Sequence, residues 1–177
     1  MFLKVQLPWN VVISPKNLDG KGLLLQRSII VQLMEEFANR KATKDYGYHI
    51  AVTTLMKIGE AKVREQGDVM FPVKFNCVTF KPFAGEVLLG VVTKVLKHGV
   101  FMDCGPVENV FLATKTMPDY DYVHGENPVF MSKELSKVEK GAKVRFMVVA
   151  TQWVESERIF KIIGSLAGDY LGPISVS

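Results

Sequence analysis

The strongest evidence of the fold lies in residues 85–106, which read GEVLLGVVTKVLKHGVFMDCGP. Residues Glu86–Leu96 and Val100–Cys104 are rich in β-branched and apolar side chains, which indicates two strands. Lys97-His98-Gly99 joins them, because glycine tolerates turn conformations that would strain a larger residue. The segment therefore predicts two neighbouring strands connected by a short turn.

The residues around this turn indicate what the strands could bind. Successive side chains of a strand point to opposite faces, so an inward Val100 places Phe101 outward. An outward aromatic ring beside Lys97 and His98 on a small barrel is typical of a base-stacking platform with phosphate contacts nearby. Phe111 could lie on the same face; the alternative is that the connection 114–141 covers both phenylalanines. Arg145 and Arg158 are candidate phosphate contacts. The full set of candidate RNA-binding residues is Lys97, His98, Phe101, Phe111, Arg145 and Arg158.

The rest of the second half shows short strand patterns separated by Gly, Pro, Asp and Asn clusters. Segment 114–141 is expected to be irregular, with a brief strand at Val129–Met131 inside it. Five short strands with one long connection predict the five-stranded barrel of the oligonucleotide-binding (OB) fold. Its remaining strands are expected at Asn109–Leu112, Val144–Val154 and Ile159–Ser165.

The first half carries one strong helix pattern, from about Gly22 to Lys41. Apolar residues recur on one face of this helix, and polar residues fall mostly on the other, so we expect the apolar stripe to pack on a sheet. The stripe consists of Leu23, Ile30, Leu33, Met34 and Phe37.

Three strand patterns flank the helix. Phe2–Leu7 alternates and meets Pro8, which ends the strand or places it at a sheet edge. Tyr48–Ile58 alternates with a period of two, which places Ile50 and Met56 on one face with Val52. The strand that begins at Val69 switches its apolar parity near its end.

That switch occurs at Val78 and Phe80, after an apolar face that runs from Val69 to Cys77. A change of parity within one strand would need a bulge or a bend. The glycine and proline of Lys81–Gly85 follow, and we place a domain boundary there. The fold class is therefore an α+β domain at 1–82, with its helix on one sheet face, followed by an all-β barrel at 83–177.

The charge distribution limits any binding to RNA. The net charge is +4, but residues 1–84 carry +5 and residues 85–177 carry −1. The barrel half is therefore not basic overall, and affinity for RNA must come from local charge and stacking. We expect this affinity to be modest.

Several classes of protein are excluded by what the sequence lacks. No apolar run approaches the length of a membrane span, and the N-terminal residues do not form a signal peptide. Cys77 and Cys104 lie in apolar strand patterns, which indicates reduced core residues and an intracellular location, and no zinc or other metal site or cofactor site is expected. Asp119 and Asp121 lie in an acidic loop where solvation is the expected role. No titratable groups converge, so no catalytic residue is expected.

The segment Gly85–Ala113 resembles the S1 RNA-binding motif, in which Gly-x-Val begins one strand and Gly-x-Phe the next. Across essentially the whole chain, the sequence is similar to the stalk subunit of multisubunit RNA polymerases, which is the seventh subunit in eukaryotes and has an archaeal equivalent. The segments 96–102, 117–120 and 125–128 look most like the plant-specific paralogue of polymerases IV and V. The wider similarity is carried by MFLKV at 1–5, VMFPVKF at 69–75, TFKPFAGEV at 79–87 and GDYLG at 168–172.

This resemblance implies that the first half is a truncated ribonucleoprotein-like (RNP-like) tip domain that docks at the base of the polymerase clamp. Ala61 stands where the family usually has a second glycine, so we expect the local backbone and the choice of partner to differ there from the rest of the family. A helical fourth-subunit partner would cover apolar surface near Val78 and Phe80. The implied docking residues are Asn17, Leu18, Ile58, Gly59, Glu60, Ala61 and Lys62.

The resemblance also implies the function: a non-catalytic, nuclear polymerase subunit that forms a stalk, contacts emerging single-stranded RNA and associates with the largest polymerase subunits. Polymerases IV and V and RNA-directed gene silencing are the expected setting. A polymerase II stalk subunit and a free-standing S1-type RNA-binding protein are the alternatives, and the largest subunit that co-purifies would distinguish them.

Overall fold

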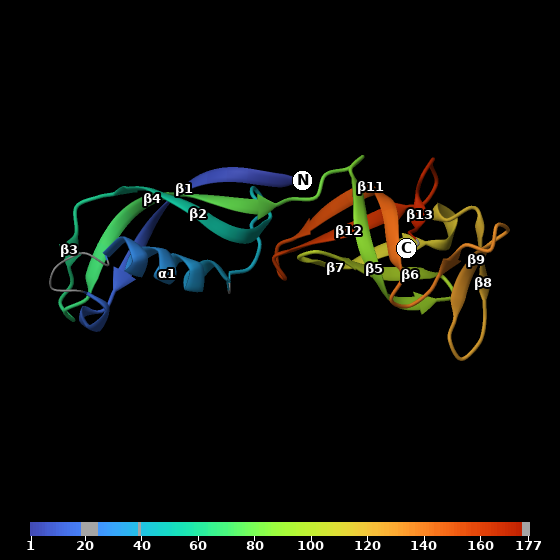
Figure 1. The fold of residues 1–177 in the computed structure, drawn as a ribbon, viewed down its shortest axis with the longest axis horizontal. Coiled ribbons are helices and arrows are strands. Elements are labelled where there is room, and N and C mark those ends of the chain that lie inside the picture. The colour runs from blue at the N-terminus through green and yellow to red at the C-terminus, as the bar shows by residue number, and fades with distance from the viewer. Residues whose placement is uncertain (19–24, 39, 175–177) are drawn as a thin grey trace. The chain divides into compact units, whose positions relative to one another are not determined.

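In the computed structural model, residues 1–18, 25–38 and 40–174 are described. They divide into two compact units (Figure 1). One unit is Phe2–Lys81, and the other contains Met1 and the residues from Pro82 onward. The described chain is mostly β-structure with one α-helix, and the second unit contains a closed five-stranded barrel. No helix within these ranges is long and apolar enough to cross a membrane.

The first unit is an antiparallel sheet with a helix along one face (Figure 1). Its order is β1 (Phe2–Ile13), β4 (Val69–Phe80), β2 (Tyr48–Ile58), and β3 (Lys62–Val63) also pairs with β4. Strand β1 is longer than predicted and continues through Pro8. It lies at the edge of the sheet, where a missing backbone N–H is tolerated, so the edge alternative is the correct one. A 3₁₀ turn, η1 (Pro15–Asn17), follows β1.

Helix α1 (Leu25–Ala38) is shorter than predicted, and the predicted residues 22–24 lie outside the described residues. Its buried face is formed by Ile29, Leu33 and Phe37, which are spaced four residues apart and therefore lie on one side of a helix. The Phe37 ring packs edge-on against the ring of Phe75, with centroids 5.2 Å apart. Met34 was expected in this stripe, but 53% of it is exposed, so that prediction is wrong. The sheet contacts a narrower face of the helix than the sequence pattern indicated.

Strand β2 has the predicted bounds but not the predicted alternation. Its pairing with β4 contains three irregularities, at each of which β2 has an extra residue. Because each bulge turns the following side chain over, the residues that pack on the core recur every third position, at Val52, Leu55 and Ile58. Ile50 and Met56 are consequently 46% and 53% exposed, which corrects the expectation that they share a face with Val52.

Of the bulge or bend that was expected at the end of β4, the pairing with β1 contains no bulge. It pairs with β1 without interruption from Phe80 opposite Phe2 to Val69 opposite Ile13. The inner face continues to Thr79, which is fully buried. Phe80 is buried on the other face, where its ring contacts that of Phe2 with centroids 5.2 Å apart. The apparent parity switch therefore marks burial on both faces of one regular strand.

The barrel is built from five strands. Their order around the barrel is β12–β7–β6–β5–β11, and β11 pairs again with β12 to close it. The pairing of β12 with β7 is parallel. The barrel interior contains Val100, Met102, Leu112 and Phe146, all without exposed surface. The five strands are β5 (Val87–Leu96), β6 (Gly99–Cys104), β7 (Val107–Ala113), β11 (Lys143–Val154) and β12 (Ile159–Ser165).

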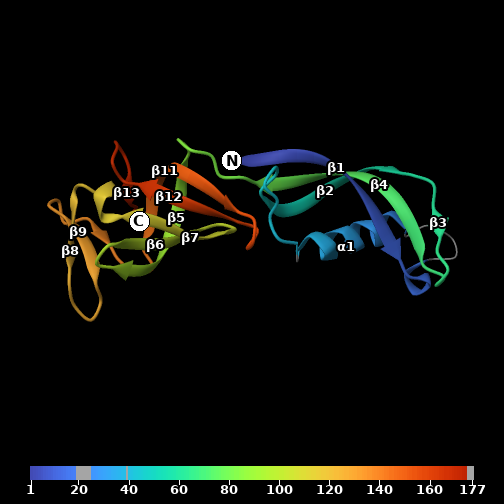
Figure 2. The same ribbon diagram turned by 180° about the vertical axis from the view of Figure 1, so that it is seen from behind.

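The long connection between β7 and β11 is more ordered than predicted. After the 3₁₀ turn η2 (Thr114–Thr116) it forms a three-stranded sheet of β8 (Tyr120–Val123), β9 (Val129–Ser132) and β10 (Lys137–Val138). Figure 2 shows β8 and β9 as a hairpin beside the barrel. Phe130 and Val138 are fully buried, which gives this small sheet apolar contacts of its own. A last short strand, β13 (Gly172–Pro173), pairs with β11.

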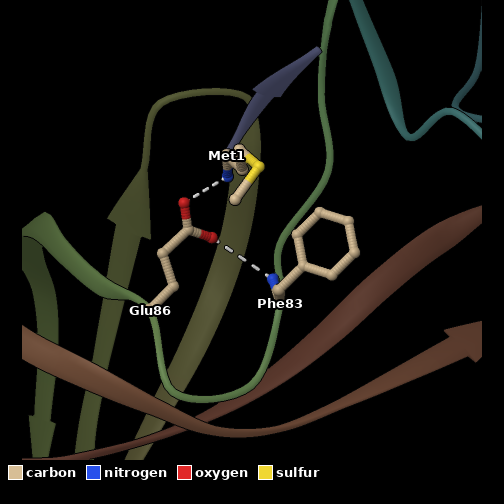
Figure 3. A network of polar contacts seen from close by, with 3 residues as sticks. All are labelled: Met1, Phe83 and Glu86. Atoms are coloured by element: carbon tan, nitrogen blue, oxygen red, sulfur yellow. Dashed lines mark hydrogen bonds and ion pairs between the residues drawn. The ribbon is translucent and has the colours of Figure 1, made fainter.

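Glu86 organises the start of the barrel unit (Figure 3). One carboxylate oxygen lies 2.5 Å from the Met1 ammonium nitrogen, and the other accepts a hydrogen bond from the backbone N–H of Phe83 at 3.3 Å. The backbone carbonyl of Glu86 accepts from the N–H of Val148 at 2.8 Å, and the N–H of Gly85 donates to the carbonyl of Val148 at 2.7 Å. These contacts tie the entry of β5 to β11.

The corrected helix face can be tested with two adjacent substitutions. Leu33→Ala should lower the free energy of unfolding of the first unit by about 2–5 kcal/mol, because it leaves a cavity in the core. Met34→Ala should change it by less than about 0.5 kcal/mol, because that side chain is largely in solvent. Denaturant unfolding followed by the fluorescence of Trp9, whose ring packs on Phe37, measures both. Equal losses for the two variants would contradict the assignment.

Candidate nucleic-acid interface

The turn after β5 and the strands β6 and β7 bring three flat side chains together. Val100 is fully buried in the barrel, and Phe101 points outward as predicted. Phe101 lies directly opposite Phe111 on β7, with ring centroids 5.0 Å apart. The His98 ring lies 6.0 Å from that of Phe111. The sequence-predicted cluster of His98, Phe101 and Phe111 therefore exists on the outer surface.

The aromatic cluster requires a glycine at position 99, because a side chain there would collide with the Phe111 ring. A Cβ atom at this position would lie 2.7 and 2.8 Å from two atoms of the Phe111 ring and would also meet the carbonyl oxygen of Leu112. Such distances are shorter than carbon atoms tolerate, so a side chain would displace the ring or the strand. The glycine thus allows the Phe111 ring to lie against the backbone of β6.

The aromatic pair forms one wall of a groove with a volume of about 570 Å³. The strand register arranges its lining in two rows. The first row is apolar and crosses four strands: Phe101 is opposite Phe111, Phe111 is opposite Ile163, and Ile163 is opposite Ala150. We call these four residues the apolar row.

The second row is polar. Lys161 is opposite Gln152 across the β11–β12 pair, and Asn109 lies two residues before Phe111 on the neighbouring β7. All three line the same groove. We call Asn109, Lys161 and Gln152 the polar row. The remaining lining residues are Glu108, Thr151, Glu157, Ile159 and Ile162. None of these side chains comes from the connection 114–141, so that connection does not cover the two phenylalanines on the side that faces the groove.

The predicted basic residues are distributed unevenly around this groove. Lys97 is exposed in the turn beside His98. Arg158 is exposed in the β11–β12 turn, adjacent to Glu157 and Ile159 of the groove. Arg145 lies apart from the groove: it is opposite Leu89 on β5, and its Nη1 atom donates to the backbone carbonyl of Tyr170 at 3.4 Å.

Sequence reasoning missed the polar row. Lys161 and Gln152 belong to strands that were predicted, but they share a groove with Asn109 only because β7 pairs with β12 to close the barrel. The charges that line the groove are Glu108, Glu157 and Lys161, and the Lys161 ammonium lies 3.9 Å from the Glu157 carboxylate. The groove lining is therefore slightly acidic, and the exposed cations Lys97 and Arg158 lie outside it, in the turns that contain His98 and Glu157.

The proposed docking loops lie at one end of the first unit. Gly67, at the end of the β2–β4 connection, lies against Pro15 of η1. A Cβ atom on Gly67 would lie 3.7 Å from the Cγ atom of Pro15. Ile58 and Leu18 pack against the core, so most of their side-chain surface is not available to a partner protein. The N–H of Gly59 donates to the carbonyl of Pro72 at 2.7 Å, and the carbonyl of Asn17 accepts from the Ser28 hydroxyl at 3.1 Å. The exposed members of the set are Asn17, Glu60, Ala61 and Lys62.

The buried titratable groups are held neutral. Burial raises the pKa of the Cys104 thiol to about 11 and also raises the pKa of Cys77. Burial lowers the pKa of His49, and the nearby Arg40 lowers it further. Thiols with raised pKa values are poor nucleophiles at neutral pH. Within the described ranges, no group of three or more His, Cys, Asp or Glu side chains is arranged to hold a metal ion.

Comparison with known proteins identifies full-length relatives. The chain is 58% identical over 176 residues to DNA-directed RNA polymerase V subunit 7 of Arabidopsis thaliana, with 99% of each chain covered. It is 49% identical over 174 residues to polymerase IV subunit 7 of the same plant, covering 98% and 99% of the two chains. It is 33% identical over 178 residues to Arabidopsis polymerase II subunit 7, covering 99% and 97%. No protein-family model matches the chain.

These similarities define an accessory polymerase subunit rather than a catalytic one. The chain belongs to the subunit 7 family of DNA-directed RNA polymerases. The resemblance inferred from the sequence is confirmed, and so is the prediction that the chain is not itself an enzyme. Among the three relatives, the polymerase V and IV subunits are more similar to it than the polymerase II subunit.

The contact between Gly99 and Phe111 leads to a test of the aromatic cluster. Gly99→Ala should destabilise the barrel unit by roughly 1–3 kcal/mol, because the added methyl group overlaps the ring. Gly125→Ala is the matched control, since no atom lies within 4 Å of its Cβ position. Denaturant unfolding followed by the fluorescence of Trp153, which lies on the barrel strand β11, reports on both. An unchanged midpoint for Gly99→Ala would show that the ring is not held there.

Proposed function

We propose that this chain is the stalk subunit of a plant polymerase of the IV and V type, and that it acts in the nucleus in RNA-directed gene silencing. The observation that carries the proposal is the 58% identity to polymerase V subunit 7 over nearly the whole of both chains. The 33% identity to polymerase II subunit 7 makes polymerase II the second candidate. A free-standing RNA-binding protein is disfavoured, because the similarity includes the first unit as well as the barrel.

The architecture supports a division of labour between a docking domain and an RNA-contacting domain. We assign residues 1–82 to a truncated RNP-like tip domain, which agrees with a sheet that carries its helix on one face. We assign residues 83–177 to an S1-type OB domain, which agrees with a closed five-stranded barrel whose longest connection joins β7 to β11.

The aromatic groove is the proposed contact for emerging single-stranded RNA. Phe101 and Phe111 offer stacking faces, and every base has a face that can stack. Lys97 and Arg158 are exposed in the turns that contain His98 and Glu157, where they can contact phosphates. The slightly acidic lining favours weak binding. Weak binding is sufficient when a subunit is held beside its ligand, because tethering raises the effective concentration.

The proposed contact with the helical fourth-subunit partner is on the outer face of β5. Phe80, near which this contact was expected, is buried against Phe2. Three successive outward residues of β5, by contrast, are exposed and apolar: Val87, Leu89 and Val91. Lys143 and Arg145 lie opposite Val91 and Leu89 on β11. A helix with an apolar stripe and acidic flanks would complement this surface.

The tip loops are the proposed contact with the largest polymerase subunits. The double variant Glu60→Ser/Lys62→Ser removes exposed side chains and leaves the core residue Ile58 in place. It should reduce the amount of largest subunit that co-purifies from plant extract, because charged rim contacts would be lost. Mass spectrometry of the affinity-purified complex identifies the largest subunit and so distinguishes polymerases II, IV and V.

The matched control is Glu139→Ser/Lys140→Ser, which removes the same charges from an exposed turn of the barrel unit. It should leave co-purification unchanged. Undiminished recovery of the largest subunit with the Glu60/Lys62 variant would remove these loops from the interface, and recovery of no polymerase subunit with the unmodified chain would refute the stalk assignment.

RNA contact through the groove can be tested by removing a stacking ring and an exposed cation. Phe101→Ala combined with Arg158→Ala should weaken binding to a single-stranded RNA by about 1–3 kcal/mol for the lost stacking contact, with a further loss of salt dependence. Filter binding measures the dissociation constant. Arg145→Ala is the control, because it removes a cation that lies apart from the groove. Equal dissociation constants for the double variant and the unmodified chain would exclude this face.

A further inference from the structure

One row of the groove is apolar and the other is polar, so the two rows can contact the face and the edge of a nucleic-acid base. We propose that the groove seats one unpaired purine of single-stranded RNA, with its face on the apolar row and its edge against the polar row. This inference rests on the proposed RNA contact and adds to it a preference for purines over pyrimidines, with Lys161 as the residue that determines the preference.

The apolar row accommodates the face of the base. Phe101, Phe111, Ile163 and Ala150 stand on four successive strands. Neighbouring strands lie about 4.8 Å apart, so the row extends about 14 Å across the barrel. The fused rings of a purine cover more of such a row than the single ring of a pyrimidine, and stacking grows with the area in contact. Stacking alone, however, discriminates only weakly between bases.

The polar row can recognise the edge. Both amide side chains, those of Asn109 and Gln152, present a donor and an acceptor, so they can pair with either the carbonyl of guanine or the amino group of adenine. The ammonium group of Lys161 can only donate. Both purines carry the acceptor N7 on the edge next to that group, and pyrimidines have no equivalent atom. A hydrogen bond from Lys161 to N7 would therefore distinguish purines from pyrimidines without distinguishing adenine from guanine.

The charges of the groove favour a base over a phosphate in its interior. Glu108 and Glu157 both line it, and Lys161 is the cation among the lining residues. A phosphate placed there would face two carboxylates, whereas an uncharged base would not be repelled. The exposed cations Lys97 and Arg158 lie outside the lining, in the turns that contain His98 and Glu157. The backbone of the RNA is thus directed along these turns and one base into the groove.

The loose ion pair between Lys161 and Glu157 leaves the lysine available. The two charged groups are 3.9 Å apart, and both side chains are more than half exposed. This geometry keeps the ammonium group near the groove, yet a base acceptor can approach it from the open side. Gln152, directly opposite Lys161, can accept from the same ammonium group or pair with the base.

The test uses the full chain and RNA nonamers that differ in one central base. The five RNA strands are U9, which contains nine uridines, and four variants of U9 whose central base is C, A, G or 7-deazaadenine. Fluorescence polarisation gives the dissociation constant of each. The A and G strands should bind about fivefold or more tightly than the U and C strands, the scale of one specific base contact. The 7-deazaadenine strand keeps the purine shape but lacks the N7 acceptor, so its affinity should fall most of the way to that of U9.

Lys161→Met should lower the affinity for the A and G strands to near that for U9, leaving only the weak preference that stacking gives. Lys140→Met, which removes the same charge from an exposed turn of the barrel unit, should leave the preference intact. Unchanged melting of both variants confirms that they remain folded.

The outcomes separate this inference from the RNA contact on which it depends. If all five strands bind equally and Phe101→Ala weakens them all, the groove contacts RNA but has no purine seat, and the inference fails alone. If 7-deazaadenine binds as tightly as adenine, or if Lys161→Met retains the preference, the assigned hydrogen bond is wrong. If no strand binds, both the inference and the proposed RNA contact fail, and the groove is left to a protein partner.

Discussion

The parallel pairing of β12 with β7 holds the barrel and its groove together. It places Ile163 opposite Phe111 and Gly164 opposite Leu112, and together with the β11–β12 pair it leaves the five-stranded sheet without a free edge. Gly164 is necessary for this closure. A Cβ atom there would lie 2.7 Å from the Phe146 ring and 2.8 Å from the Leu112 side chain, both of which are fully buried. A glycine in β12 thus lets the buried side chains fill the barrel interior.

In the first unit, a small antiparallel sheet must fit its inner face to a short helix. Its central strand β4 is regular, and β1 pairs with it from end to end. The adjustment is made by β2, whose three bulges turn every third side chain toward the core and curve the strand. The result is a compact contact between Ile29, Leu33 and Phe37 of α1 and the inner face of the sheet. The helix keeps exposed apolar side chains at Val31 and Met34.

The groove combines features that suit the proposed contact with RNA, at low affinity. Its aromatic pair can stack on any base, its lining carries more acid than base, and Lys97 and Arg158 lie in exposed turns outside the lining. For a protein that acts alone, such a surface would bind RNA only weakly, because phosphate contacts dominate the affinity for RNA. For the proposed stalk subunit it would be adequate, because holding the groove beside the emerging transcript would raise the effective concentration. Modest affinity would also allow the RNA to move past, as continuing transcription requires.

The local features of this protein follow from its sequence alone. Alternation and turn residues predicted most strands closely, including the bounds of β2 and β12, and the placement of Phe101 followed from the glycine before it and the inward Val100. What the sequence could not show depends on pairing between distant strands. The bulges of β2 appear only against β4, the burial of Phe80 requires Phe2 from the other end of the unit, and the order within 114–141 requires β8, β9 and β10 to pair. The polar row is the clearest case. Asn109, Lys161 and Gln152 are ordinary surface residues on their own strands, and only the closure of the barrel places them in one groove, because register between strands is set by the packing of the whole core.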